Sequence, residues 1–201
     1  SGLEVLKLGN SFNHSINGIL PQSLKKLKFG NKFNMVIDKK SLPEGLVELI
    51  FGNNFDHPIN GILPVGLKVL KFGDYFNYSI YPLRLINLRV LVLGNTFTQP
   101  LFNGVLQQGL KILHLGDDYN QPLYNHSLPE ELEELRLGYH FNHPIEAGSI
   151  PASLKILVLG KGFKQTIHKG SLPINLETLV LHTGQDPKEF LDDCSITKIY
   201  K

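Results

Sequence analysis

The sequence predicts a mainly β repeat solenoid with one parallel sheet along its concave side. Three observations predict this fold. An aromatic residue recurs every 21 or 22 residues, a glycine recurs with the same period, and a segment of the form L-x-x-L-x-[LF] precedes each glycine. A unit of this length cannot bury its apolar residues by itself, so it must stack on copies of itself.

The leucine segment predicts a short strand in each repeat. Examples are LEVLKLG at 3–9 and LKILHLG at 110–116. The last two leucines alternate with polar or β-branched residues, which is the period of a strand with one buried face. The glycine then lets the chain turn out of the strand. A ninth copy, LETLVLH at 176–182, carries His182 instead of glycine.

The aromatic column is expected to form a buried stack, with neighbouring rings about 5 Å apart. Its members are Phe12, Phe33, Phe55, Phe76, Phe97, Tyr119, Phe141 and Phe163. The next residue is usually asparagine, whose amide can bond the backbone of its own and the neighbouring coil and so form a ladder. The asparagines are Asn13, Asn34, Asn77, Asn120 and Asn142; Asp56, Thr98 and Lys164 stand at the other positions.

A Leu-Pro or Ile-Pro pair, such as Leu20-Pro21, precedes most leucine segments and predicts an extended return path. The full unit, F-N-x-x-I…G-x-L-P-x-x-L-x-x-L-x-[LF]-G, resembles the FNIP (IP22) repeat, a leucine-rich-repeat subfamily known from social amoebae and large DNA viruses. The resemblance covers residues 3 to about 182. It implies a right-handed superhelix with irregular or short extended return segments. Arg84-Leu85 and Leu106-Gln107 replace Leu-Pro, so we expect those coils to be looser on the return side but to keep the strand register.

The chain divides into a solenoid over 1–182, with about nine repeats of which the first is truncated, and a C-terminal cap over 183–201. Asp186 and Pro187 predict a short helix near 187–193. We expect Phe190, Leu191, Ile196 and Ile199 to lie over the last coil. Because the first coil begins inside a repeat, we expect either further protein upstream or self-association at this N-terminal end.

Composition indicates an intracellular globular protein. The net charge is +2 and 42% of residues are hydrophobic, without the basic runs of a nucleic-acid binder or an apolar run long enough for a membrane. Cys194 is the sole cysteine, which excludes an intramolecular disulfide and favours a reducing compartment. We therefore expect a cytoplasmic protein, including the cytoplasm of a virus-infected host cell, with an unknown protein partner.

The sequence contains no convincing catalytic or metal-binding pattern. His14, His57 and His143 share one column, but the first two are two coils apart, about 10 Å, too far to ligate one ion. We interpret them as solvated turn residues. No nucleophile elbow, Cys–His pair or phosphate-binding loop is present. The sequence thus predicts a non-enzymatic protein without cofactor or metal.

The exposed face of the sheet is the predicted protein-binding site, because the residues on either side of each middle leucine point out of it. Val69, Val90, Val92 and Ile112 would form an apolar strip, although β-branched residues also serve strand formation alone. The strip contains no aromatic anchor. Two other functions remain open: assembly through the first coil, and nucleic-acid binding through Lys7, Lys26, Lys28 and Lys71. The sequence does not decide between the concave and the return face. The candidate binding residues are Val69, Lys71, Val90, Val92, Ile112, His114, Glu134 and Arg136.

Overall fold

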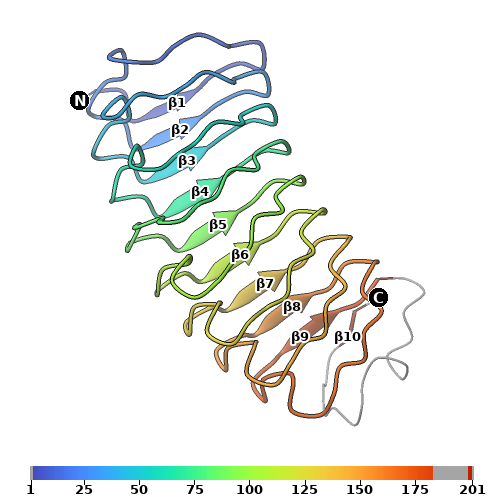
Figure 1. The fold of residues 1–201 in the computed structure, drawn as a ribbon. Coiled ribbons are helices and arrows are strands. Elements are labelled where there is room, and N and C mark those ends of the chain that lie inside the picture. Colours follow the sequence, from blue (N-terminus) through green and yellow to red (C-terminus); the bar gives the residue numbers. More distant parts are fainter. Residues whose placement is uncertain (1, 183–198, 201) are drawn as a thin grey trace.

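The chain folds into a single parallel sheet whose strands follow one another in sequence order (Figure 1). The computed structural model describes residues 2–182 and 199–200. Each strand of the repeat has three residues. The strands are β1 (Val5–Lys7), β2 (Lys26–Lys28), β3 (Glu48–Ile50), β4 (Val69–Lys71), β5 (Val90–Val92), β6 (Ile112–His114), β7 (Glu134–Arg136), β8 (Ile156–Val158), β9 (Thr178–Val180) and β10 (Ile199–Tyr200).

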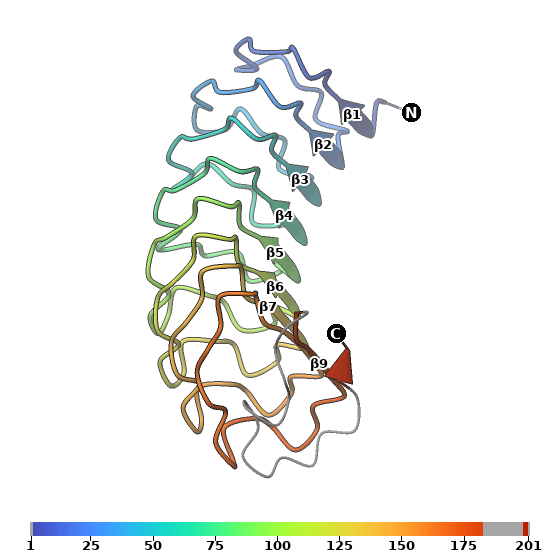
Figure 2. The same ribbon diagram turned by 90° about the vertical axis from the view of Figure 1, so that its right-hand side faces the viewer.

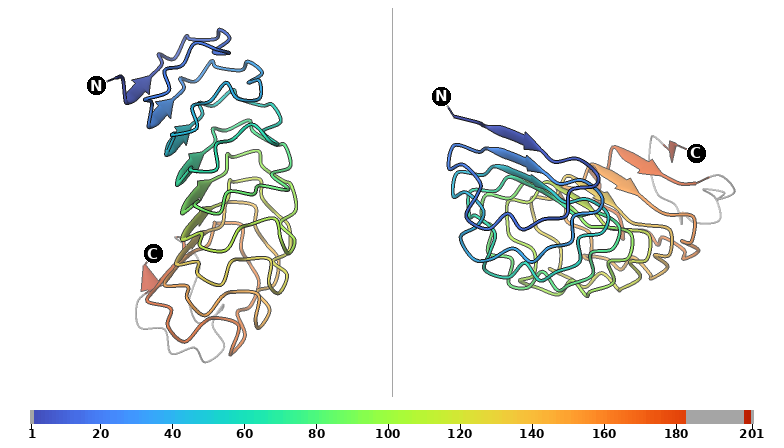
Figure 3. Two further views of the ribbon diagram at one scale, coloured as in Figure 1. Left: turned by 90° about the vertical axis from the view of Figure 1, so that its left-hand side faces the viewer. Right: turned by 90° about the horizontal axis from the view of Figure 1, so that it is seen from above.

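The middle leucine of each repeat strand lies opposite the middle leucine of the next, for example Leu70 opposite Leu91 and Leu91 opposite Leu113. This register aligns the coils, and we number each coil by the strand that begins it. The strands line the concave side of the solenoid, while irregular return segments form the convex side (Figures 2 and 3). The predicted leucine-rich-repeat-like solenoid is therefore confirmed, and the described residues contain no helix.

Two aromatic columns fill the core of the first coils. Phe29, Phe51 and Phe72 come from the strand segments, and their ring centroids are 5.4 Å apart. The column that begins at Phe12 lies further from the sheet. The centroids of its neighbouring rings are 6.0–6.4 Å apart, whereas about 5 Å was expected. Strands pair at about 4.8 Å. The spacing thus widens from the sheet towards the return side, which is why the sheet lies on the inside of the curve.

Successive coils touch backbone to backbone at the glycine column. A Cβ added at Gly94 would overlap the carbonyl oxygen of Gly73, and one at Gly73 would overlap that of Gly52. The same holds from Gly30 to Gly160, whereas Gly9 in the first coil has open space around its Cα. The glycine is therefore required by the close approach of the neighbouring coil, in addition to the turn that the sequence suggested.

The side chains of the asparagine column form hydrogen bonds with the backbone of the next coil. The side-chain oxygen of Asn13 accepts from the backbone N–H of Asn34 at 2.9 Å, and Asn142 accepts from Lys164 at 2.8 Å. Asp56 takes the same role in its coil and accepts from the N–H of Asn77 at 3.2 Å. Each of these side chains thus satisfies a backbone donor of the next coil. The same arrangement holds from Asn34 to Asp56, from Asn77 to Thr98 and from Asn120 to Asn142.

Two parts of the chain depart from the regular repeat, namely the coils without Leu-Pro and the C-terminal segment. Coils 4 and 5 keep the strand register although both lack Leu-Pro. In the C-terminal segment, β10, which contains Ile199, extends the sheet by pairing with β9 of the last coil. The predicted helix near 187–193, with Phe190 and Leu191, together with Ile196 and Cys194, lies outside the described residues.

Tyr119 is the one tyrosine among the phenylalanines of its column. Its side chain is fully buried, and burial raises the pKa of its phenol above the usual value. The backbone of Leu101 partly offsets this rise, but among the described residues no group meets hydrogen-bond geometry with the hydroxyl. A buried hydroxyl without a partner is destabilising.

We predict that Gly94→Ala lowers the free energy of unfolding by about 1–3 kcal/mol, because the methyl group would push coils 4 and 5 apart. Gly9→Ala is the matched control in the same column. It should change stability by less than about 0.5 kcal/mol, since nothing lies within 4 Å of its added Cβ. Urea unfolding followed by circular dichroism measures both variants. Equal effects would contradict coil contact as the reason for the column.

We also predict that Tyr119→Phe leaves stability unchanged or raises it by roughly 1 kcal/mol, because it removes the unpaired hydroxyl and keeps the ring. Phe97→Tyr, one coil earlier, should lower stability by a comparable amount by adding a buried hydroxyl. Thermal melting of both variants tests this. A loss of stability in Tyr119→Phe would show that the hydroxyl contributes a favourable contact.

Candidate protein-binding face

The concave face presents two rows of side chains, one on each side of the buried middle leucines. Strand register places Val69 beside Val90 and Val90 beside Ile112 in one row. In the other row, Lys71 lies beside Val92 and Val92 beside His114. The rows are therefore continuous across coils, and every residue of the sequence-predicted strip reaches this face.

The aliphatic strip, which we define as Val69, Val90, Val92 and Ile112, lies at the centre of the concave face. Each of the four side chains is partly exposed, whereas the middle leucines of their strands are buried. Val69, Val90 and Ile112 follow one another across three strands, and Val92 flanks them. The strip is thus one contiguous apolar surface.

A charged cluster ends the strip on its C-terminal side. Glu134 accepts hydrogen bonds through one oxygen, Oε1, from His114 Nε2 at 2.8 Å and from Arg136 Nε at 2.6 Å. Burial would raise the pKa of Glu134, but these two hydrogen bonds outweigh it and hold the pKa below its usual value. Burial lowers the pKa of His114, partly offset by the bond to Glu134. The cluster is therefore an ordered polar boundary.

A basic surface ends the strip on its N-terminal side. Lys7 lies beside Lys28 in adjacent strands, while Lys26 pairs with Glu48 at 3.1 Å. Lys71, the fourth lysine of the nucleic-acid hypothesis, is separated from Lys28 by Ile50. One of the four lysines is therefore neutralised and one is isolated from the rest, so the row lacks the continuous positive groove that tracks a nucleic-acid backbone.

The histidines of the turn column make contacts that the sequence did not suggest. His57 Nε2 lies 3.1 Å from the carbonyl oxygen of Asn34, and His143 Nε2 lies 3.1 Å from that of Asn120. Each imidazole thus bonds the backbone one coil back, which corrects the interpretation that these residues only face solvent. Over residues 2–182 and 199–200, no three metal-ligating side chains gather in one place. Within the same ranges, no helix has the length and hydropathy needed to cross a membrane.

Sequence reasoning missed a group of exposed aromatic residues on the return side. Tyr81, Phe102 and Tyr124 are 48%, 44% and 56% exposed. They occupy equivalent positions in coils 4, 5 and 6, directly after the buried anchors Ile80, Leu101 and Leu123. The signal in the sequence is the position directly after each of these anchors, which holds an aromatic residue in three successive coils.

Comparison with known proteins agrees with this architecture. The model of the FNIP repeat matches residues 1–32, 33–64, 55–85, 97–140 and 141–184. Among solved structures, the chain is similar to CroV588 from the large DNA virus CroV, described as a novel circular leucine-rich-repeat protein, with 31% identity and a TM-score of 0.67. The similarity covers 98% of this chain but only 27% of CroV588. No curated protein matches.

The matched segments cover most of the chain and contain every strand of the repeat except β5. The chain belongs to the FNIP repeat family.

Proposed function

We propose that the chain is a non-catalytic protein-binding module that engages its partner through the concave face. The observation that carries this proposal is the aliphatic strip, a contiguous and partly exposed apolar surface at the centre of the sheet. A solenoid that exposes an extended concave sheet is suited to hold a partner along several coils.

The surroundings of the strip support the proposal. Protein interfaces combine an apolar centre with a polar rim. Here the rim is formed by Lys71 and by the His114–Glu134–Arg136 cluster, whose hydrogen bonds fix the positions of its charges. An ordered rim needs little further ordering when a partner binds, which lowers the entropic cost of association.

The chemistry on the face favours binding over catalysis. Its polar groups lie in rows along the sheet, and the Glu134 carboxylate is already occupied by two donors. A catalytic site instead needs a nucleophile or a base that converges on a pocket. We therefore propose no enzymatic activity and no cofactor for this chain.

We predict that Val90→Lys/Val92→Lys abolishes capture of the partner, because two ammonium groups would have to be desolvated at the centre of the interface. The experiment compares, by quantitative mass spectrometry, the proteins retained from the producing cell by the wild type and by the variant. Circular dichroism confirms that the variant is folded.

The matched control is Val36→Lys/Ile174→Lys, which adds the same charge at positions that are 58% and 96% exposed and outside the sheet. It should retain the wild-type set of proteins. If the strip variant captures the same proteins as this control, the concave face is not the binding site.

A second candidate function is assembly through the first coil. Leu3 is 51% exposed, whereas the corresponding Leu24 and Leu46 are buried, and Val5 is 47% exposed. Copies that join at this coil would cover both side chains. Sedimentation at two concentrations, without a partner, should then show a mass that rises with concentration, and Val5→Lys should suppress the rise. A constant monomer mass would exclude this function.

A further inference from the structure

We propose that the partner of the concave face presents an extended acidic segment, whose carboxylates bind a row of lysines while its aliphatic side chains cover the aliphatic strip. This inference rests on the proposed function and names the chemistry of the partner. The lysine row, defined as Lys7, Lys28 and Lys71, occupies the last position of β1, β2 and β4. Its first two members are exposed and the third is partly exposed.

Positive charge is concentrated on the outward side of the sheet. Two positions in each of β1 to β9 point out of it, one on either side of the middle leucine. These positions hold four lysines and one arginine but only two glutamates, which gives the face a net charge of +3. The whole chain has a net charge of +2. The rest of the molecule is therefore slightly negative, and the field of the protein directs an acidic partner to this face.

Neither glutamate of the face neutralises the lysine row. Glu48 pairs with Lys26 at 3.1 Å, and Glu134 accepts hydrogen bonds from His114 and Arg136. Within residues 2–182 and 199–200, the three side chains of the lysine row form no ion pair. The excess charge of the face thus resides on these three ammonium groups, which are suited to bind carboxylates.

The fold itself does not require the lysine row. Lys7 lies directly opposite Lys28 in the neighbouring strand, and like charges in this arrangement repel each other. A carboxylate placed between the two ammonium groups would replace this repulsion with two favourable ion pairs. Other coils have an aliphatic residue at the same strand position, namely Ile50, Val92, Val158 and Val180. The row is thus better explained by binding than by folding.

A small pocket marks the place where the first carboxylate binds. It lies over β1, β2 and β3 and has a volume of about 50 Å³. A water molecule needs about 10–15 Å³ of such space, so the pocket has room for the three heavy atoms of a carboxyl group. Lys7 and Lys28 line it with apolar side chains such as Ile50, and Glu48, which also lines it, is held by Lys26. The apolar walls reduce screening by water and so strengthen the attraction between a carboxylate and the lysines.

Distances along the face set the spacing expected in the partner. Strands pair at about 4.8 Å, so the backbone of Lys28 in β2 lies about 10 Å from that of Lys71 in β4 and about 14 Å from that of Val92 in β5. An extended chain advances about 3.3 Å per residue. Two carboxylates about three residues apart can thus reach Lys28 and Lys71. An aliphatic residue about four residues from the first carboxylate reaches Val92.

A protein segment fits this arrangement better than a nucleic acid does. Ile50 interrupts the row between Lys28 and Lys71, and the aliphatic strip follows in the next strands. A nucleic acid carries a phosphate at every nucleotide and would place several of them against these apolar side chains without a cation. An acidic protein segment can instead combine carboxylates with aliphatic side chains, as an apolar interface with a charged rim requires.

The test is selection of a phage-displayed library of random twelve-residue peptides on the full chain. We expect the enriched sequences to contain at least two Asp or Glu residues and, within about five residues of them, Leu, Ile, Val or Met. The most enriched peptide is then synthesised with a fluorophore, and its affinity is measured by fluorescence polarisation. Binding should weaken as salt concentration rises, because part of it is ionic.

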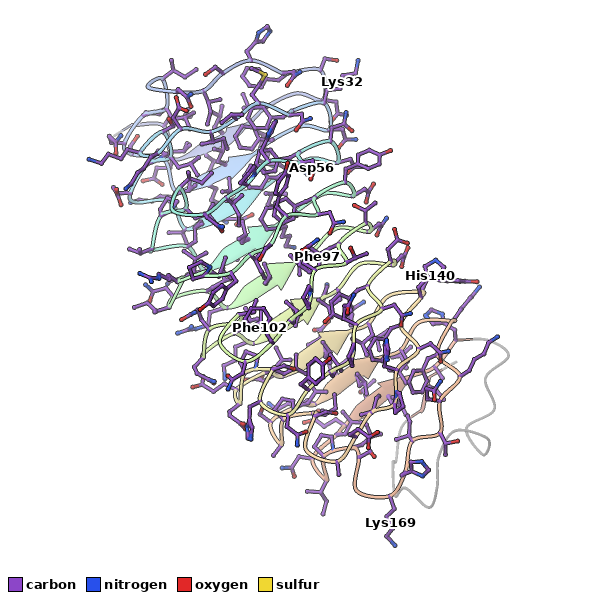
Figure 4. The ribbon with its side chains drawn as sticks, in the orientation of Figure 1. Lys32, Asp56, Phe97, Phe102, His140 and Lys169 are labelled. Carbon is purple, nitrogen blue, oxygen red and sulfur yellow. The ribbon has the colours of Figure 1, made fainter. Side chains whose placement is uncertain are left out.

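Lys7→Gln/Lys28→Gln should weaken binding of this peptide on the order of ten-fold, because it removes both cations of the pocket and keeps long polar side chains. The melting temperature should stay unchanged or rise, since the repulsion between the two strands is also removed. The matched control is Lys32→Gln/Lys39→Gln, which removes the same charge from exposed positions of coil 2. Lys32 lies in the turn after β2, away from the strands (Figure 4). The control should keep the wild-type affinity within about two-fold.

A second variant separates this inference from the proposed function. Val90→Thr/Val92→Thr keeps the β-branched shape of the strip but makes it less apolar, so it should also weaken binding several-fold. Suppose the peptide loses affinity for this variant but binds Lys7→Gln/Lys28→Gln as tightly as the wild type. The concave face then binds protein, and the acidic partner is wrong. Unchanged affinity for both variants would contradict the proposed function as well.

Two further results would overturn the proposal. The first is a selection that enriches nothing, or that enriches peptides without acidic residues. The second is displacement of the bound peptide by a single-stranded oligothymidine of equal charge, which would assign the face to nucleic acid instead.

Discussion

Close backbone contact between successive coils at the glycine column governs the geometry of this solenoid. The carbonyl of one glycine occupies the space that a Cβ of the next would need, as at Gly73 and Gly94. This contact holds the coils close beside the sheet, where short parallel strands pair. Everything further from the sheet must adapt to a stacking distance set there, including the aromatic columns and the asparagine ladder.

The curvature of the solenoid follows from the room that stacked side chains need at increasing distance from the sheet. The rings of the Phe29–Phe51–Phe72 column are 5.4 Å apart, and those of the deeper column are 6.0–6.4 Å apart. Stacked aromatic rings need more room than paired strands, so the coils spread on the return side. The sheet consequently lies on the inside of the curve, and its outward side chains converge on a shared concave space.

The two faces consequently differ in chemistry. The concave face has strand residues. Those at its centre are β-branched, a type that favours a pleated surface, and ordered ion pairs such as Glu134 with Arg136 lie beside them. The return face is free of strand geometry, and there the chain can vary a position without disturbing the stack. Polar residues are replaced by Tyr81, Phe102 and Tyr124 in adjacent coils only. Such variation on a constant scaffold is a route to a specific surface.

The sequence by itself determined the fold class, the strand positions and the columns, because a 21–22-residue period with leucine, glycine and aromatic residues leaves few ways to bury the apolar side chains. It also placed Val69, Val90, Val92 and Ile112 on one face, since strand residues alternate. Only the tertiary structure decided what depends on distances between coils. The ring spacing, the bond from His143 to the Asn120 carbonyl and the contact of Tyr81 with Phe102 all arise between residues about 21–23 positions apart. Periodicity predicts that such residues are neighbours, but curvature and rotamers determine which of their atoms meet.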